Sequence, residues 1–181
     1  MAAISRVIVG VSGSPGSLPA ARYAAELARA HRAPLLPVFV WQPPGGDLIE
    51  RSHPAPVLRD LWAEAASARL HTALQTAFGG LPQDLPLEPQ VVRGEPGRSL
   101  VEVASEAGDL LVIGAGRRRL VRRALHAGVS RYCLAHAHCP VLAVPPSPLD
   151  QALGRFGLRG WALRRRQLSP ADIAAPPATR T

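Results

Sequence analysis

The chain has 181 residues, a length typical of one domain with a short additional segment. Apolar residues make up 47% of the sequence, which is enough for a full core, and no apolar run approaches the roughly 18 residues of a membrane span. The formal net charge is +8, and there is no lysine, which excludes the lysine-dependent P-loop motif.

The N-terminal sequence MAAISRVIVGV runs almost directly into a strand pattern. It lacks the basic region, the long apolar stretch and the small-residue cleavage site of a secretory signal. Two cysteines, Cys133 and Cys139, are too few for the disulfide framework of a small secreted protein. We therefore expect the protein in the cytoplasm.

The first part of the chain alternates apolar runs with a helical pattern. Residues 6–11 (RVIVGV) form an apolar, β-branched run typical of a strand buried on both faces. The glycine- and serine-rich stretch GVSGSPGS follows at residues 10–17, and an alanine-rich helical pattern covers residues 18–33. Leu35–Trp41 is predicted to be a second strand, in which Pro37 favours an edge position or a bulge.

A long helix is predicted after a proline- and glycine-rich loop of roughly 15 residues, which exceeds the usual length of a connection. The helical pattern covers residues 57–78 and ends at Gly79-Gly80. Its apolar positions are Leu58, Leu61, Trp62, Ala65, Ala68, Ala73, Leu74 and Phe78. The later elements are predicted as a strand at residues 87–92, a turn at 93–97, a helix at 99–107, a strand at Asp109–Gly114, a helix at 124–136 and a strand at 140–144.

The regular alternation of strands and helices predicts an α/β fold with an open parallel sheet and helices on both faces. Ligands of such sheets lie beyond the carboxyl ends of the strands, where the strand order reverses. Glycine-rich segments follow the first and the fourth predicted strands. If these two strands are neighbours, both segments face one crevice, which is a hypothesis for a nucleotide site.

The last segment, residues 147–181, differs in composition from residues 1–146, which we expect to form the folded domain. It is rich in proline at both ends and in arginine between them. Its middle can form a short basic amphipathic helix, although three glycines weaken that helix in isolation. The alternative is a disordered, basic, proline-rich tail.

Three pieces of the sequence, in this order, resemble the universal stress protein family. The opening RVIVGVSGSPGSLPAARYAAELARAHRAPLLPVFVW resembles the family's first strand, glycine-serine turn and helix. VVRGEPGRSLVEVASEAGDLLVIGAG resembles its third strand, Gly-x-Pro turn, helix and fourth strand, and GVSRYCLAHAHCPVLAVPP resembles its closing helix and strand. The similarity covers about residues 4–145, and no single piece is specific enough alone.

The resemblance implies a five-stranded parallel sheet in the order 3-2-1-4-5, of the adenine nucleotide alpha hydrolase-like type. It also implies a homodimer formed through the last strand, Val141–Val144. In one branch of the family, Gly-x2-Gly-x9-Gly-Ser/Thr after the fourth strand holds the phosphates of ATP through backbone amides. An aspartate after the first strand contacts the nucleoside, and backbone of the second strand lies near the adenine.

This sequence departs from the ATP-binding pattern at several of its positions. Gly114 matches the first glycine, but the second falls on Arg117, with Gly116 one position earlier. Ser12 stands at the position of the aspartate, and Val38 at the position in the second strand whose backbone lies near the adenine. The resemblance therefore implies a weak or degenerate nucleotide site with the candidate residues Gly10, Val11, Ser12, Val38, Gly114, Gly116, Arg117, Ala127, Gly128, Val129 and Ser130.

Other sites have weaker support from the sequence. Cys133, His136, His138 and Cys139 offer four metal donors within seven residues, but spacing this tight rarely closes a tetrahedron, and we expect core thiols instead. The spacing shows no obvious Asp or Ser partner for acid–base catalysis at His31, His53, His71 or His126. We therefore assign no catalytic residue and no protein metal site.

The sequence thus predicts a universal stress protein-like stress-response protein that acts through conformation or partner binding rather than as an enzyme. Its expected ligand is ATP or another adenine nucleotide, with Mg²⁺ only as a companion of the nucleotide. Two alternatives stay open. One is a nucleotide hydrolase or transferase of the same fold, and the other is a basic adaptor whose tail binds nucleic acid or a membrane, partners that we consider less favoured than the nucleotide.

Overall fold

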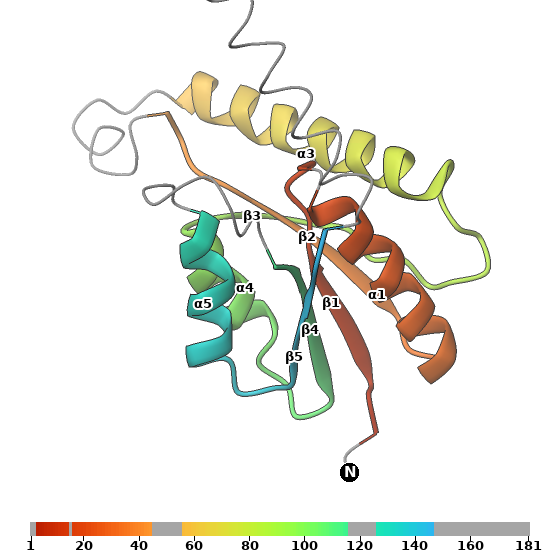
Figure 1. The fold of residues 1–181 in the computed structure, drawn as a ribbon. Helices are drawn as coiled ribbons and strands as arrows, with labels where there is room; N and C mark the ends of the chain where they lie inside the picture. Colours follow the sequence, from red (N-terminus) through yellow and green to blue (C-terminus); the bar gives the residue numbers. More distant parts are fainter. Residues whose placement is uncertain (1–2, 15, 45–55, 116–125, 147–181) are drawn as a thin grey trace, which may run out of the picture. The chain divides into compact units, whose positions relative to one another are not determined.

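A computed structural model describes residues 3–14, 16–44, 56–115 and 126–146 of the chain. Its core is a five-stranded parallel sheet in the order β3-β2-β1-β4-β5, so the predicted fold class and strand order are confirmed (Figure 1). The strands are β1 (Arg6–Gly10), β2 (Leu35–Trp41), β3 (Gln90–Arg93), β4 (Asp109–Gly114) and β5 (Val141–Val144). The helices are α1 (Ser17–His31), α3 (Pro56–Phe78), α4 (Pro96–Val103) and α5 (His126–His136).

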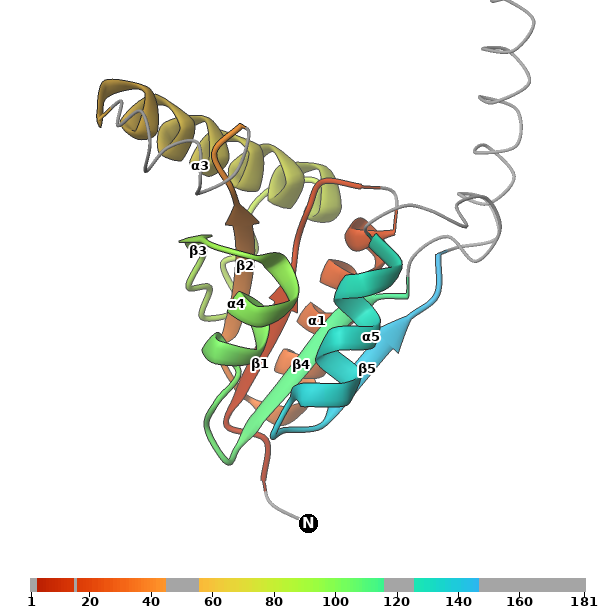
Figure 2. The same ribbon diagram turned by 90° about the vertical axis from the view of Figure 1, so that its left-hand side faces the viewer.

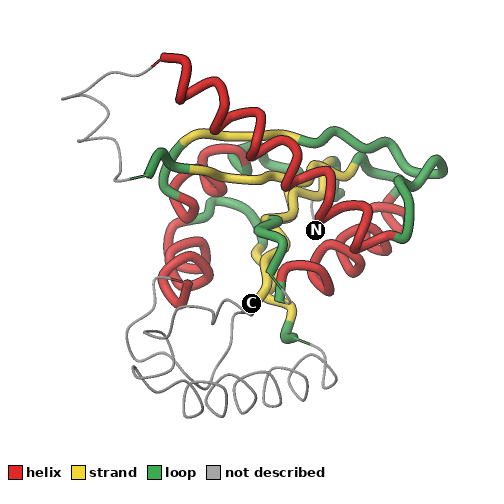
Figure 3. The backbone as a smooth tube through the Cα atoms, turned by 90° about the horizontal axis from the view of Figure 1, so that it is seen from above, coloured by secondary structure: helices red, strands yellow, loops and turns green. Residues whose placement is uncertain are grey.

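Helices cover both faces of the sheet, as the alternation of elements predicts. Helices α1 and α3 lie on one face, and α4 and α5 on the other (Figures 1 and 2). Seen from above, the strands run between these two groups of helices (Figure 3). Alternate residues of β1 point to the two faces of the sheet. Val7 and Val9 pack on the side of α1 and α3, whereas Ile8 packs with Leu100 and Cys133 on the other side.

The central strands are buried on both faces, which explains their uninterrupted apolar sequences. Val7, Ile8 and Val9 of β1 are fully buried, as are Leu111 and Val112 of β4. Small residues on α1 let it approach the sheet closely, because its buried face consists of Ser17 and alanines. A strand whose two faces are covered by helices has no need of polar alternation.

The position of Pro37 differs from the prediction. Strand β2 is second in the sheet and pairs with both β1 and β3, so Pro37 is not on an edge strand. Leu35 donates to the Pro86 carbonyl and accepts from the Glu88 amide, and strand alternation turns the nitrogen of Pro37 to the same side. Because proline has no N–H, the ladder is interrupted there.

The interruption shortens the third strand relative to the predicted residues 87–92. An isolated bridge joins Leu35 to Leu87, and regular pairing resumes only where Val38 meets Gln90. Pro89, directly before Gln90, is a second residue without an amide donor. Strand β3 therefore begins three residues later than expected.

Helix α4 also begins and ends earlier than predicted. Its first residue is Pro96, and the Glu95 carboxylate accepts hydrogen bonds from the amides of Gly97 and Arg98. Its last residue is Val103 rather than Ala107. A turn takes the place of the last helical residues before β4.

The buried face of α3 agrees with the predicted stripe only in the second half of the helix, at Ala73 and Leu74. The buried residues are Ala66, Leu70, Ala73, Leu74 and Ala77. Val57, Leu58 and Leu61 are exposed, with 74%, 47% and 53% of their surface accessible. Helix α3 carries apolar residues on two different faces, and only the alanine-rich face contacts the core.

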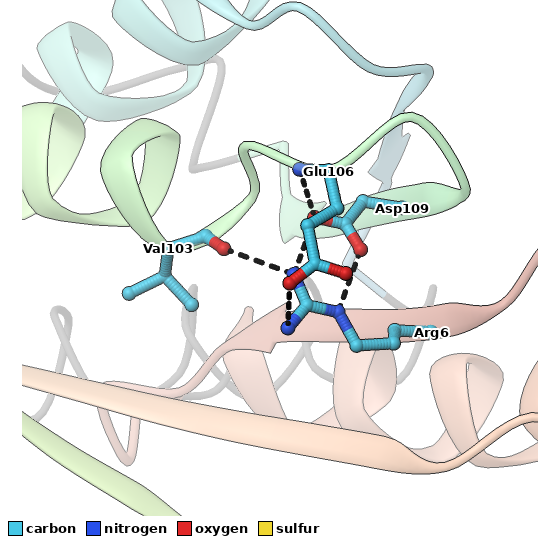
Figure 4. Close-up of polar contacts among 4 residues, drawn as sticks. All are labelled: Arg6, Val103, Glu106 and Asp109. Atoms are coloured by element: carbon cyan, nitrogen blue, oxygen red, sulfur yellow. Dashed lines mark hydrogen bonds and ion pairs between the residues drawn. The ribbon is translucent and has the colours of Figure 1, made fainter.

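A buried ion pair joins the amino ends of β1 and β4 (Figure 4). The Arg6 guanidinium donates from Nε and Nη2 to the two oxygens of Asp109, each at 2.8 Å, and Nη1 lies 2.9 Å from Glu106 Oε1. The Glu106 amide also donates to Asp109, at 2.9 Å. The Asp109 side chain is fully buried, so each of these bonds replaces one to water.

Contacts divide the chain into two units, Met1–Pro146 and Ser147–Thr181, and the described residues all belong to the first. Among the helices that the structure describes, none is both long and apolar enough to cross a membrane.

Asp109→Asn is expected to lower the free energy of unfolding at neutral pH by about 2–4 kcal/mol, because Arg6 then loses its bidentate partner. Burial raises the pKa of Asp109, but the hydrogen bonds from Arg6 and the Glu106 amide outweigh burial and hold this pKa below its ordinary value of 3.8. The stabilisation is therefore complete above that value and is lost as the pH falls through the lower pKa of the folded state. Denaturant titrations at several pH values measure both effects.

Glu102→Gln is the matched control, because it removes an exposed i,i+4 pair with Arg98. It should change stability little. Equal stability of Asp109→Asn and the wild type at neutral pH would contradict the role assigned to the buried pair.

Candidate functional site

A cleft lies at the carboxyl ends of the central strands, where the strand order reverses. Gly10 ends β1, Val38 and Val40 belong to β2, and Ile113 and Gly114 end β4. The cavity between them has a volume of about 250 Å³. Among the described residues, its lining consists of Gly10, Val11, Ser12, Ser14, Gly16, Ser17, Val38, Val40, Pro96, Leu100, Ile113, Gly114, Val129 and Ser130.

The turn between β1 and α1 supplies hydroxyl groups to this cleft. Ser12 Oγ donates to Ser14 Oγ at 3.0 Å, and Ser17 Oγ donates to the Ser14 carbonyl at 3.0 Å. The same carbonyl accepts from the backbone amides of Ser17 and Leu18. Gly13, with φ of 71°, provides the left-handed backbone that this tight turn requires. The glycine-serine stretch is thus a self-bonded turn along one side of the cleft.

Gly114 allows β4 to end directly against the start of α1. A Cβ atom at Gly114 would lie 2.5 Å from the Gly16 carbonyl oxygen, which no side chain tolerates. Ser130, in the second turn of α5, donates to the Gly114 carbonyl at 2.9 Å. Gly114 therefore joins β4, α1 and α5 at one point, and this junction forms the polar floor of the cleft.

The opposite wall is apolar. Val38 and Val40 approach it from β2, Leu100 from α4 and Ile113 from β4. Val11 donates its amide to the Val38 carbonyl at 2.9 Å, which fixes the β1 end of the cleft against β2. The cleft is therefore amphipathic, with an apolar wall on the β2–α4 side and hydroxyl and backbone groups on the α1–α5 side.

Seven of the predicted site residues come together in this cleft: Gly10, Val11, Ser12, Val38, Gly114, Val129 and Ser130. Ala127 and Gly128 lie in the first turn of α5, and Gly128 is not among the described residues that line the cavity. Gly116 and Arg117 lie outside the described residues. Contact of any of these residues with a nucleotide stays a prediction.

The sequence also left several lining residues unidentified. Val40 follows Val38 by two positions, so the period of a strand could have placed it on the same face. Ser14 and Ser17 belong to the glycine-serine stretch and carry the same signal as Ser12. Pro96 and Leu100 carry no local signal, because their position depends on how α4 crosses the sheet.

Cys133 is a core thiol, as expected. It is fully buried, and its Sγ lies 3.7 Å from the Gly97 carbonyl. Burial raises the pKa of Cys133 to about 11, so the group is a neutral thiol at physiological pH. His136 stacks on Tyr132, with ring centroids 4.1 Å apart. The described residues contain no group of three or more histidine, cysteine or acidic side chains placed to hold a metal ion.

Residues 3–145 match the model of the universal stress protein family. Among solved structures, a universal stress protein in complex with cAMP is 28% identical, with a TM-score of 0.52, and the match covers 81% of this chain and all of that one. The universal stress protein UspA from Lactobacillus plantarum is 20% identical, with a TM-score of 0.56 and coverage of 80% and 99%. A search of curated proteins gives no match.

Gly114→Ala should separate the end of β4 from the start of α1, because the new Cβ meets backbone that cannot rotate away. We expect a loss of about 1–3 kcal/mol of unfolding free energy, as for other overpacked sites. Thermal and denaturant unfolding measure this loss.

Gly128→Ala is the control on the same side of the molecule. A Cβ at Gly128 meets no atom of the described residues within 4 Å, and alanine is the better helix former, so this variant should be unchanged or slightly more stable. If both variants had the same stability, the close approach of Gly114 to Gly16 would be disproved.

Proposed function

The chain belongs to the universal stress protein family, and from this premise we propose that its cleft binds an adenine nucleotide. The observation that carries the proposal is the cleft itself, which joins an apolar wall to a floor of backbone and hydroxyl groups. A purine base packs against an apolar wall, whereas ribose and phosphate oxygens need hydrogen bonds from backbone and hydroxyl groups. The similar universal stress protein in complex with cAMP supports an adenine nucleotide as the ligand.

Within the cleft, we propose that the base lies against Val38 and Val40 and that the phosphate side faces Gly114 and Ser130. The described lining contains hydroxyls and backbone but no carboxylate. Mg²⁺ prefers oxygen ligands and commonly binds through the phosphates of its substrate. Any Mg²⁺ would therefore be coordinated by the phosphates of the nucleotide rather than by these side chains.

The hydrogen bonds of the cleft favour binding over catalysis. Ser12 donates to another hydroxyl, while Ser17 and Ser130 donate to backbone carbonyls. None of these neutral acceptors is a base strong enough to take the proton and activate a serine as a nucleophile. We therefore propose a stress-response protein that acts through conformation or partner binding, with no chemical step on the nucleotide.

We also propose that residues 1–146 are the nucleotide-binding domain, that residues 147–181 are a separate basic tail, and that two copies associate through β5. Strand β5 pairs with β4 through the carbonyls of Pro140 and Val144. Strand alternation then turns the amides of Val141 and Ala143 toward the other, open edge. An apolar edge strand with free amides is a template for pairing with another strand.

Calorimetric titration of the full chain with ATP, AMP and cAMP tests the proposed ligand, with GMP as the control for the base. Adenine nucleotides should bind saturably and more tightly than GMP. Val40→Phe should weaken their binding at least about tenfold, because the ring occupies the apolar side of the cavity.

Val92→Phe is the matched control for this titration. Val92 pairs with Val40 in the sheet and packs on the same core layer, but it does not line the cleft. The control should retain nucleotide binding. A folded wild type that binds no adenine nucleotide at millimolar concentration would refute the proposal.

Ala143→Pro tests the dimer, because it removes an outward amide without removing a bond to β4. Analytical ultracentrifugation should find a dimer for the wild type and a monomer for this variant. Ala143→Thr keeps the amide and should remain dimeric. A monomeric wild type, or a dimeric proline variant, would exclude β5 as the interface.

A further inference from the structure

A second cavity lies outside the cleft, between α3 and the turn that follows β1. Its volume is about 330 Å³, close to the lower limit of ordinary ligand pockets. One wall is the face of α3 that carries Arg69, Thr72 and Thr76, and the other is formed by Gly13 and Leu18. We call this cavity the α3 groove. The lining residues named for it are those of the described part of the chain.

The polar groups of the α3 groove form a row along one side of the helix. Arg69, Thr72 and Thr76 are spaced three and four residues apart, so they point to the same side. The axial rise of a helix places Arg69 roughly 10 Å from Thr76. The groove therefore offers two separated polar ends with an apolar stretch between them, formed by Leu18 and Ala73.

The two ends of the row have opposite hydrogen-bonding character. Thr72 Oγ1 donates to the Ala68 carbonyl at 2.9 Å, and Thr76 Oγ1 donates to the Thr72 carbonyl at 2.7 Å. Both hydroxyl protons are thus used within the helix, and the oxygens remain as acceptors. Arg69 carries a permanent positive charge with five N–H donors. Within the described residues, it makes no hydrogen bond or ion pair.

From this arrangement we propose that the α3 groove binds a small amphipathic organic acid. The carboxylate pairs with the Arg69 guanidinium, the apolar body lies against Leu18 and Ala73, and a hydroxyl at the far end donates to Thr76. Charge complementarity fixes the acidic end of the ligand, because arginine binds carboxylates bidentately. The distance of roughly 10 Å along the helix fixes the length of the ligand.

Nucleotide binding is not a premise of this proposal, since Ser12 is the one residue that the described linings of the groove and the cleft have in common. The test is a titration of the full chain, without nucleotide, with para-hydroxyphenylpropionate, followed by amide NMR spectra. Saturable shifts should centre on Gly13, Thr72 and Thr76. Shifts centred on Val40 and Val129, or no saturable shift at millimolar concentration, would overturn the proposal.

Three variants assign the interactions. Arg69→Gln should weaken binding at least about fivefold, and the amide analogue of the probe should bind the wild type just as weakly, because both remove the ion pair. Ala68→Trp should abolish binding by filling the groove. Arg59→Gln is the matched control, since Arg59 is an exposed arginine of the same helix outside the groove, and it should bind like the wild type. Equal affinity of Arg69→Gln and Arg59→Gln would disprove the role of Arg69.

Discussion

The ion pair between Arg6 and Asp109 is the constraint on which the rest of the structure depends. These residues face each other in the parallel register of β1 and β4, the two central strands. The pair lies at the amino ends of the strands, and the candidate site lies at their carboxyl ends. A slip of one residue would turn every side chain of β1 to the opposite core layer. The pair therefore aligns Gly10 and Gly114 at one edge of the sheet.

At the carboxyl ends of the strands, two glycines fix how closely the neighbouring elements approach. Gly114 ends β4 so close to Gly16 that a side chain would force β4 and α1 apart. Gly10 has a milder role, since a Cβ there would lie 3.0 Å from the end of the Leu100 side chain, which can rotate. The shape of the cleft thus follows from close approaches at these two glycines rather than from polar side chains.

The central strands were predictable because burial on both faces leaves a continuous apolar run, as in β1 and β4. The buried face of α3 was predicted correctly only in its second half, at Ala73 and Leu74. Its core contacts come from Ala66, Leu70 and Ala73, while an exposed stripe with Leu58 and Leu61 is just as apolar. Periodicity identifies a helix, but it cannot choose between two apolar faces. Only the crossing of α3 over α1 decides which one is buried.

The candidate site also contains residues that the sequence predicts and residues that it does not. The rule that ligands lie at the carboxyl ends of parallel strands places Gly10, Val38 and Gly114 together without any structure. Pro96 and Leu100 enter the cleft through the packing of α4, which depends on contacts distant in the sequence. The same limit applies to Pro37, whose missing amide was expected at a sheet edge or a bulge but is accommodated by an interrupted ladder with β3.

Within the part of the chain that the structure describes, Ser12 is the one residue that lines both the cleft and the α3 groove. Its hydroxyl donates to Ser14, and the Ser14 carbonyl accepts the first amides of α1. A ligand on either side therefore meets the same hydrogen-bonded turn. If a ligand in one cavity changes this turn so that the affinity of the other cavity changes by some factor, a ligand in the other cavity must change the affinity of the first by the same factor, because coupling between two binding sites is reciprocal. The glycine-serine turn thus connects the two cavities physically, although neither cavity needs the other in order to form.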